Sequence, residues 1–129
     1  MIAEGAGATS VAAVLFNKID VKGKKVVAIV SGGNIDVTIL SRVIKRGLMT
    51  SGRSCTLCIE LMDKPGQLSL VSDIIAKCGG NVVSVHHERA SETQDINGCF
   101  LRLSIETRNY EHIAQIEHAL KEAGLKVVD

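Results

Sequence analysis

The sequence is poor in aromatic residues, with two phenylalanines, one tyrosine and no tryptophan among its 129 residues. Surfaces that bind nucleic acid use aromatic side chains for base stacking, or a stripe of lysine and arginine that tracks the phosphates. The formal net charge is only +1, and no such stripe is present. We therefore predict no nucleic-acid partner.

Long apolar segments are also absent. No uninterrupted apolar run approaches the roughly 20 residues that cross a bilayer, and the first residues lack the basic and apolar order of a signal peptide. We predict no membrane association and a cytoplasmic location. Because such a location keeps thiols reduced, we expect the four cysteines, Cys55, Cys58, Cys78 and Cys99, to be thiols and not disulfides.

Cys55 and Cys58 have the C-x-x-C spacing of many metal sites, and His86 and His87 offer further ligands on paper. Residues three apart on a strand point to opposite faces, and adjacent histidines diverge in the same way. We therefore predict ordinary strand cysteines and no metal site.

Proline is scarce as well: the single proline lies in the segment Asp63-Lys64-Pro65-Gly66-Gln67-Leu68. The apolar pattern changes there from the alternation of a strand, over 55–62, to the spacing of a helix. Pro65 fixes one backbone angle and Gly66 admits a conformation closed to other residues, so the segment is a tight strand-to-helix turn. Unpaired amides at the start of the helix attract a negative group, such as a small carboxylate. A purely structural turn is the alternative.

The chain divides into two parts before this turn. Basic residues outnumber acidic ones in the first 50 residues, and the balance reverses afterwards. Residues 49–53 have the small, polar composition of a linker. We predict a first unit at residues 1–48 and a second unit at residues 54–129.

The first unit is predicted to contain a helix from about Ala8 to Asn17, a strand at Lys25–Val30 and a helix whose apolar stripe runs from Ile35 to Ile44. The continuous β-branched run of the strand is typical of a strand buried on both faces of a parallel sheet. Two helices cannot bury such a strand alone. The unit is therefore expected to be a fragment of an α/β domain. We expect residues 1–48 to be partly disordered or to find a partner chain, since Val26 to Val30 would otherwise expose apolar surface and unpaired strand edges.

Two motifs in this unit carry a family resemblance: Glu4-Gly-Ala-Gly-Ala-Thr-Ser10 and Ser31-Gly-Gly-Asn34. Residues 2–48 resemble the C-terminal end of the catalytic domain of serine/threonine dehydratases (threonine ammonia-lyases), which are pyridoxal-phosphate enzymes. The resemblance implies that Ser31 hydrogen-bonds the pyridine nitrogen of the cofactor in the intact enzyme. A lone Ser-Gly-Gly-Asn segment would more often be a simple glycine turn.

The catalytic parts of that family have no counterpart in this sequence. Neither its Schiff-base lysine motif nor its glycine-rich phosphate loop is present, and cofactor chemistry requires both. We therefore expect no catalytic residue and no cofactor in this chain alone. An active lyase would require a lysine site that the sequence does not show.

The second unit has a regular order of predicted elements. They are a strand at 55–62, a helix at 67–77, a strand at 81–88, a polar connection at 90–97, a strand at 99–107, a helix capped by Asn109, and a strand at 125–128. This βαββαβ order predicts an α+β, ferredoxin-like fold.

In that order, the turn at 63–68 resembles the loop of the ACT domain, a small amino-acid-sensing module, over residues 54–129. The resemblance implies an amino-acid effector, isoleucine or valine, held by Asp63, Pro65, Gly66, Gln67, Leu68 and Asn81. Asp63 stands where the family commonly has an amide. A carboxylate there favours the effector's ammonium, so the amides near Gly66 must hold the effector's carboxylate.

The outer face of the predicted sheet carries the apolar side chains Cys58, Met62 and Phe100 among polar ones. Both helices are expected on the other face, so a second copy would cover this one, and we predict a homodimer. Scattered surface hydrophobics are the alternative. Together these features predict a regulatory module of a threonine dehydratase; a ligand-free dimerisation module is the rival interpretation.

Overall fold

The structure is a computed structural model that describes residues 2–89 and 98–128. The chain forms two compact units, residues 1–44 and 45–129. The boundary between them falls inside helix α2 (Val37–Thr50). This helix also includes residues 49 and 50, the first two residues of the predicted linker at 49–53. No helix within the described ranges is long and apolar enough to cross a membrane.

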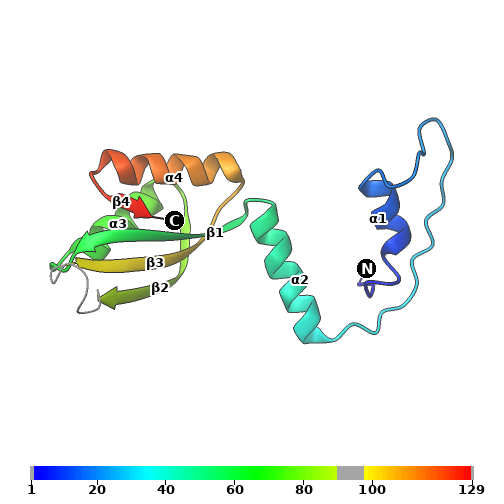
Figure 1. The fold of residues 1–129 in the computed structure, drawn as a ribbon, viewed down its shortest axis with the longest axis horizontal. Helices are drawn as coiled ribbons and strands as arrows, with labels where there is room; N and C mark the ends of the chain where they lie inside the picture. The colour runs from blue at the N-terminus through cyan, green and yellow to red at the C-terminus, as the bar shows by residue number, and fades with distance from the viewer. Residues whose placement is uncertain (1, 90–97, 129) are drawn as a thin grey trace. The chain divides into compact units, whose positions relative to one another are not determined.

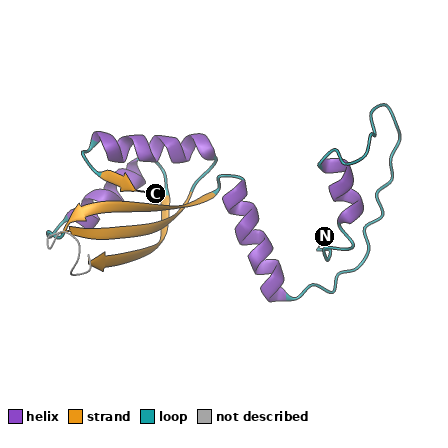
Figure 2. Ribbon diagram, in the orientation of Figure 1, coloured by secondary structure: helices purple, strands orange, loops and turns teal. Residues whose placement is uncertain are grey.

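The second unit is built on an antiparallel sheet with strand order β2-β3-β1-β4 (Figures 1 and 2). The strands are β1 (Ser54–Met62), β2 (Asn81–Arg89), β3 (Gly98–Glu106) and β4 (Lys126–Val128). Helices α3 (Gln67–Lys77) and α4 (Tyr110–Glu122) cover one face. The predicted βαββαβ order is confirmed, and the predicted connection at 90–97 lies outside the described residues.

The core lies between the helices and the covered face of the sheet. Alternate residues of β1 and β3 supply one half of it, as their period-two pattern predicted. The buried apolar residues are Leu57, Ile59, Leu61, Cys99, Leu101, Leu103 and Ile105 from the sheet, with Val71, Ile75, Ile116 and Leu120 from the helices. Leu68, in the first turn of α3, is 48% exposed.

Helix α4 begins as the sequence predicted, since the Asn109 side chain accepts a hydrogen bond from the backbone N–H of His112 at 2.9 Å. His112 is buried, with an exposed fraction of 3%, which the sequence pattern did not predict. Its Nδ1 accepts from the Arg108 N–H at 3.1 Å, and its Nε2 lies 2.8 Å from the carbonyl oxygen of Cys78. A neutral imidazole with its proton on Nε2 satisfies both contacts and ties α4 to the end of α3.

The first unit contains helix α1 (Thr9–Leu15), which is shorter than the predicted 8–17, and the start of α2. The predicted strand at Lys25–Val30 is wrong: these described residues belong to no ladder. A strand requires a partner to pair its backbone groups, and the described part of this unit supplies none. Val27 and Ile29 are 90% and 76% exposed, so this segment leaves apolar surface uncovered in the single chain.

Candidate functional site

The turn between β1 and α3 has the predicted geometry. Gly66 has φ +88°, in the left-handed region that favours glycine, and its carbonyl accepts the N–H of Leu70 at 3.0 Å. Within the described residues no side-chain hydrogen bond caps α3 at Gly66, and the first turn of this helix contains no acidic residue. Because the first N–H groups of a helix have no partner within the helix, this end of α3 offers amides to an anion.

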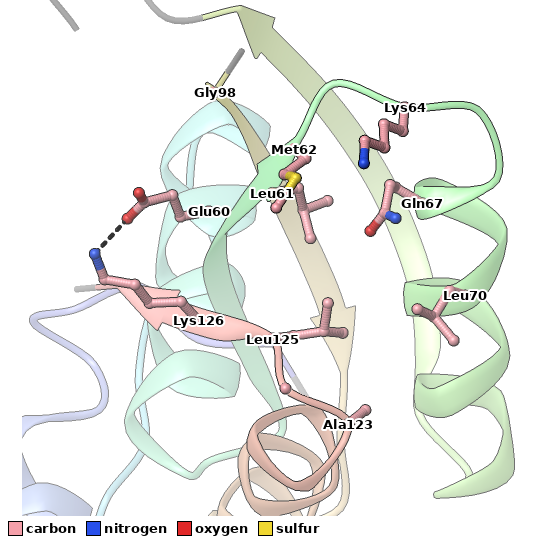
Figure 3. Close-up of a pocket in the computed structure, with 11 residues that line it drawn as sticks. Glu60, Leu61, Met62, Lys64, Gln67, Leu70, Gly98, Ala123, Leu125 and Lys126 are labelled. Atoms are coloured by element: carbon pink, nitrogen blue, oxygen red, sulfur yellow. Dashed lines mark ion pairs between the residues drawn. The ribbon is translucent and has the colours of Figure 1, made fainter. Parts of the chain in front are cut away.

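A groove of about 720 Å³ opens on one side of the turn (Figure 3). It lies between the end of β1, the start of α3, the end of α4 and β4. Its apolar wall is formed by Leu61, Met62, Leu70 and Leu125. Gln67 is the one predicted effector residue that lines it.

Charges of both signs lie at the rim of this groove. Lys126 and Glu60 face each other across the β1–β4 pair, with Nζ 2.6 Å from Oε2, and Lys64 adds a second ammonium (Figure 3). The groove therefore combines an apolar wall with cationic and anionic groups. These are the groups that the side chain, carboxylate and ammonium of an amino acid require.

A smaller cavity of about 90 Å³ lies on the β2 side of the turn. Four of the predicted residues, Asp63, Gly66, Gln67 and Leu68, line it together with His87 and Cys99. Pro65 does not line it and is exposed in the turn. The turn thus gathers most of the predicted site into one place in a single chain.

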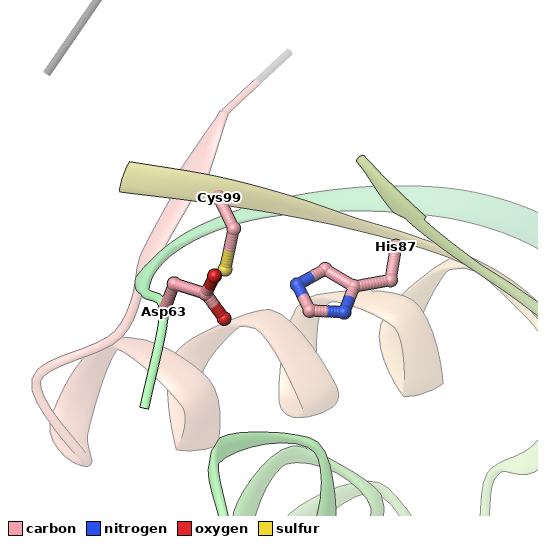
Figure 4. Close-up of side chains that lie close together, drawn as sticks. All are labelled: Asp63, His87 and Cys99. Carbon is pink, nitrogen blue, oxygen red and sulfur yellow. The ribbon is translucent and has the colours of Figure 1, made fainter. Parts of the chain in front are cut away.

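His87 and Cys99 line this cavity, which the sequence pattern did not predict. In the β2–β3 register His87 lies opposite Leu101 and Arg89 opposite Cys99, so positions 87 and 99 are diagonal neighbours on the covered face. Ligand atoms of Asp63, His87 and Cys99 lie within 4.8 Å of one another, and Figure 4 shows the His87 ring turned toward the other two side chains. This convergence can be predicted only when the register of β2 against β3 is known.

Asn81 lies elsewhere. It opens β2, and its Nδ2 donates to Glu106 Oε2 at 2.8 Å. Asn81 and Ser54 both pair with Glu106, whereas the turn follows Met62 at the other end of β1. Eight residue steps along a strand span about 25 Å, so within one chain Asn81 and the turn do not meet.

In the first unit, the two motifs that carry the family resemblance lie against each other. The Glu4 N–H donates to the Gly32 carbonyl at 3.2 Å, and the buried Gly7 packs on the carbonyl of Ser31. Ser31 itself is exposed. It offers one hydroxyl, whereas a complete pyridoxal-phosphate site also needs an aldimine lysine and a phosphate cradle. The residues of this chain alone do not fit the cofactor.

No protein-family model matches the chain, but several curated proteins do. The L-threonine ammonia-lyase of Thermotoga maritima is 46% identical over 127 residues, which cover 98% of this chain and 31% of that protein. The L-threonine ammonia-lyase of Geobacter sulfurreducens is 37% identical over 127 residues, covering 98% and 32%. The biosynthetic L-threonine dehydratase of Lactococcus lactis is 42% identical over 76 residues, covering 58% and 18%. The chain spans about a third of the length of the first two relatives.

Proposed function

Because the chain is homologous along 98% of its length to the C-terminal part of L-threonine ammonia-lyases, we propose that residues 54–129 are an amino-acid-sensing ACT domain of such an enzyme. In the intact enzyme, pyridoxal phosphate would supply the electron sink for the conversion of L-threonine to 2-oxobutanoate and ammonia. Threonine loses water in this reaction, and the same amount of water is taken up again when ammonia is released by hydrolysis. Residues 1–48 contribute Ser31 to the cofactor site there, and the second unit regulates the reaction.

The uncapped start of α3 beside the groove is the observation that carries this proposal. The effector's carboxylate binds the first amides of α3 with help from Lys64, and its ammonium binds a carboxylate of Glu60 or Asp63. The aliphatic side chain of isoleucine or valine packs on the wall formed by Leu61, Met62, Leu70 and Leu125. The mixed charge and apolar wall of the groove support this choice of ligand.

A homodimer completes the proposal. Met62 is 61% exposed, and Cys58 and Phe100 are half-buried on the sheet face that the helices leave uncovered. A second copy would remove these side chains from water. In such a dimer, Asn81 of one copy approaches an effector that is bound at the turn of the other copy. An effector then regulates the enzyme if it favours one arrangement of the pair.

The rival function is a dimerisation module without a ligand. The same uncovered sheet face favours this function, because a second copy would bury its apolar side chains whether or not a ligand occupies the groove. The two functions differ in one respect that can be measured: only a sensor responds to amino acids.

Thermal melting of the full chain with isoleucine, valine, threonine and serine separates the two. A ligand that binds only the folded state stabilises it, by about 2.7 kcal/mol at 100 times the dissociation constant. Gly66→Val tests the site, since a β-branched residue is strained at φ +88° although no atom of the described residues lies within 4 Å of a Cβ there. Gly66→Asn is the matched control, because asparagine tolerates this conformation.

We expect isoleucine or valine to raise the melting temperature of the wild type and of Gly66→Asn. Gly66→Val should lose this response and remain a dimer by analytical ultracentrifugation. A dimer that responds to no amino acid would support the ligand-free module instead.

A further inference from the structure

Asp63, His87 and Cys99 come from different parts of the second unit, namely the turn after β1, strand β2 and strand β3. Their carboxylate, imidazole and thiol groups nevertheless converge, with ligand atoms within 4.8 Å of one another (Figure 4). The backbone fixes this convergence, because Cys99 pairs with Leu61 in the β1–β3 ladder and His87 pairs with Leu101 in the β2–β3 ladder.

We propose that Asp63, His87 and Cys99 bind one divalent transition-metal ion, for which Zn²⁺ is the best match. Zinc accepts sulfur, nitrogen and oxygen ligands, whereas Mg²⁺ and Ca²⁺ prefer oxygen alone. The thiolate of Cys99 and the carboxylate of Asp63 together balance the charge of the ion.

The distances fit after a small adjustment. Zinc bonds of about 2.0–2.3 Å in a tetrahedron place the ligand atoms roughly 3.3–3.8 Å apart, so the cluster must close by about 1 Å. Cys99 is 2% exposed, whereas Asp63 and His87 are exposed, so rotation of these two side chains would bring their ligand atoms closer to the thiol. Side-chain rotation alone supplies the closure, with no change in the sheet.

A fourth coordination position opens into the 90 Å³ cavity, which is also lined by Gly66, Gln67 and Leu68. That volume holds a few water molecules. Three protein ligands with an open position form the arrangement of zinc sites that bind a water or a small ligand. Binding replaces the S–H bond of Cys99 by a metal–sulfur bond, and the thiol proton passes to solvent.

The metal site does not depend on amino-acid sensing, because the chain itself supplies all three ligands. The test therefore uses metal alone. The full chain, stripped with a chelator, is titrated with Zn²⁺ by calorimetry and with Co²⁺ by absorbance. We expect one ion per chain, release of one proton, and a cobalt spectrum with a thiolate charge-transfer band and tetrahedral d–d bands.

His87→Gln and Asp63→Asn should each weaken Zn²⁺ binding by at least tenfold. His86→Gln is the matched control for the first, because His86 lies opposite Arg102 on the other face of the sheet. Cys99→Ser should abolish the thiolate charge-transfer band. Cys58→Ser is its control and should keep that band. Since Cys99 is buried, its variant is first checked for folding by circular dichroism; His87 is exposed, so its variant tests the site without that concern.

The proposal is overturned if the chain binds no Zn²⁺ or if the cobalt spectrum lacks the thiolate band. It is also overturned if His86→Gln and His87→Gln lose the same amount of Zn²⁺ affinity. Retention of affinity in both control variants, with loss in His87→Gln and Asp63→Asn, establishes the site.

Discussion

Gly7 lies directly against the carbonyl group of Ser31, and a Cβ at position 7 would overlap that oxygen. The Glu4 N–H donates to the Gly32 carbonyl in the same place, at 3.2 Å. The glycine motif before α1 and the Ser-Gly-Gly turn are therefore parts of one local structure. Only glycine fits at position 7, because its neighbour there is backbone and cannot rotate away.

Gly7→Ala should separate the two motifs. Overpacking of this kind costs about 1–3 kcal/mol, and the Glu4–Gly32 hydrogen bond should weaken with it. Hydrogen exchange of the Glu4 amide measures the effect, and we expect faster exchange in the variant. Gly5→Ala is the control, since a Cβ there meets no atom of the described part of the chain within 4 Å. Equal exchange in the two variants would show that the contact does not hold the motifs together.

His112→Ala should destabilise the second unit, because it leaves the Cys78 carbonyl and the Arg108 N–H without the partners they have now. Each lost partner costs about 1–3 kcal/mol, so we expect a loss of about 2–6 kcal/mol in the free energy of unfolding. Urea denaturation measures it. His118→Ala on the same helix is the control, because the His118 side chain is 74% exposed and its loss should cost less than about 0.5 kcal/mol. Similar losses in the two variants would contradict the structural role of His112.

Much of the second unit could be predicted from the sequence because its signals are local. The change of apolar period at Pro65 placed α3 at Gln67–Lys77, and Asn109 marked the start of α4. Alternation along β1 and β3 also identified the buried residues. Each of these inferences uses neighbours within one element.

The misses share a different cause, since they depend on residues far apart in the sequence. Residues 25–30 have a strand's composition, but a strand exists only with a partner, and none is at hand among the described residues of the unit. The buried position of His112 depends on the Cys78 carbonyl of another helix. The convergence of His87 with Asp63 and Cys99 depends on strand register, which periodicity alone does not give.

Cys55 should react slowly with thiol reagents. Burial raises the pKa of its thiol, and the negative charge of Glu117 raises it further, so the reactive thiolate is scarce at neutral pH. Glu117→Gln removes the smaller of these causes and should lower the pKa of Cys55, which shifts the pH dependence of its alkylation toward lower pH. Mass spectrometry of iodoacetamide labelling over time measures the rate at this residue. Glu122→Gln, on the same helix, is the control and should leave the rate unchanged.

Asp36 caps α2 and should make the start of that helix sensitive to acid. Its Oδ1 accepts the N–H of Thr38 at 2.7 Å and that of Ile39 at 3.3 Å, and these hydrogen bonds lower the pKa of the carboxyl from its ordinary value of 3.8. A carboxylate with a lowered pKa stabilises the folded form above its unfolded-state pKa, and this contribution is lost as the pH falls through the folded-state value. The cap should therefore persist below pH 3.8 and disappear in stronger acid.

The amide proton shift of Thr38, followed by NMR as the full chain is acidified, reports the titration of this cap. We expect a single step with its midpoint below 3.8, the ordinary pKa of the carboxyl. Asp36→Asn keeps a capping oxygen but has no proton to gain, so the step at Thr38 should be absent from that variant while other carboxylates still titrate. A midpoint at or above the ordinary value, or the same step in Asp36→Asn, would show that Asp36 does not hold the start of α2.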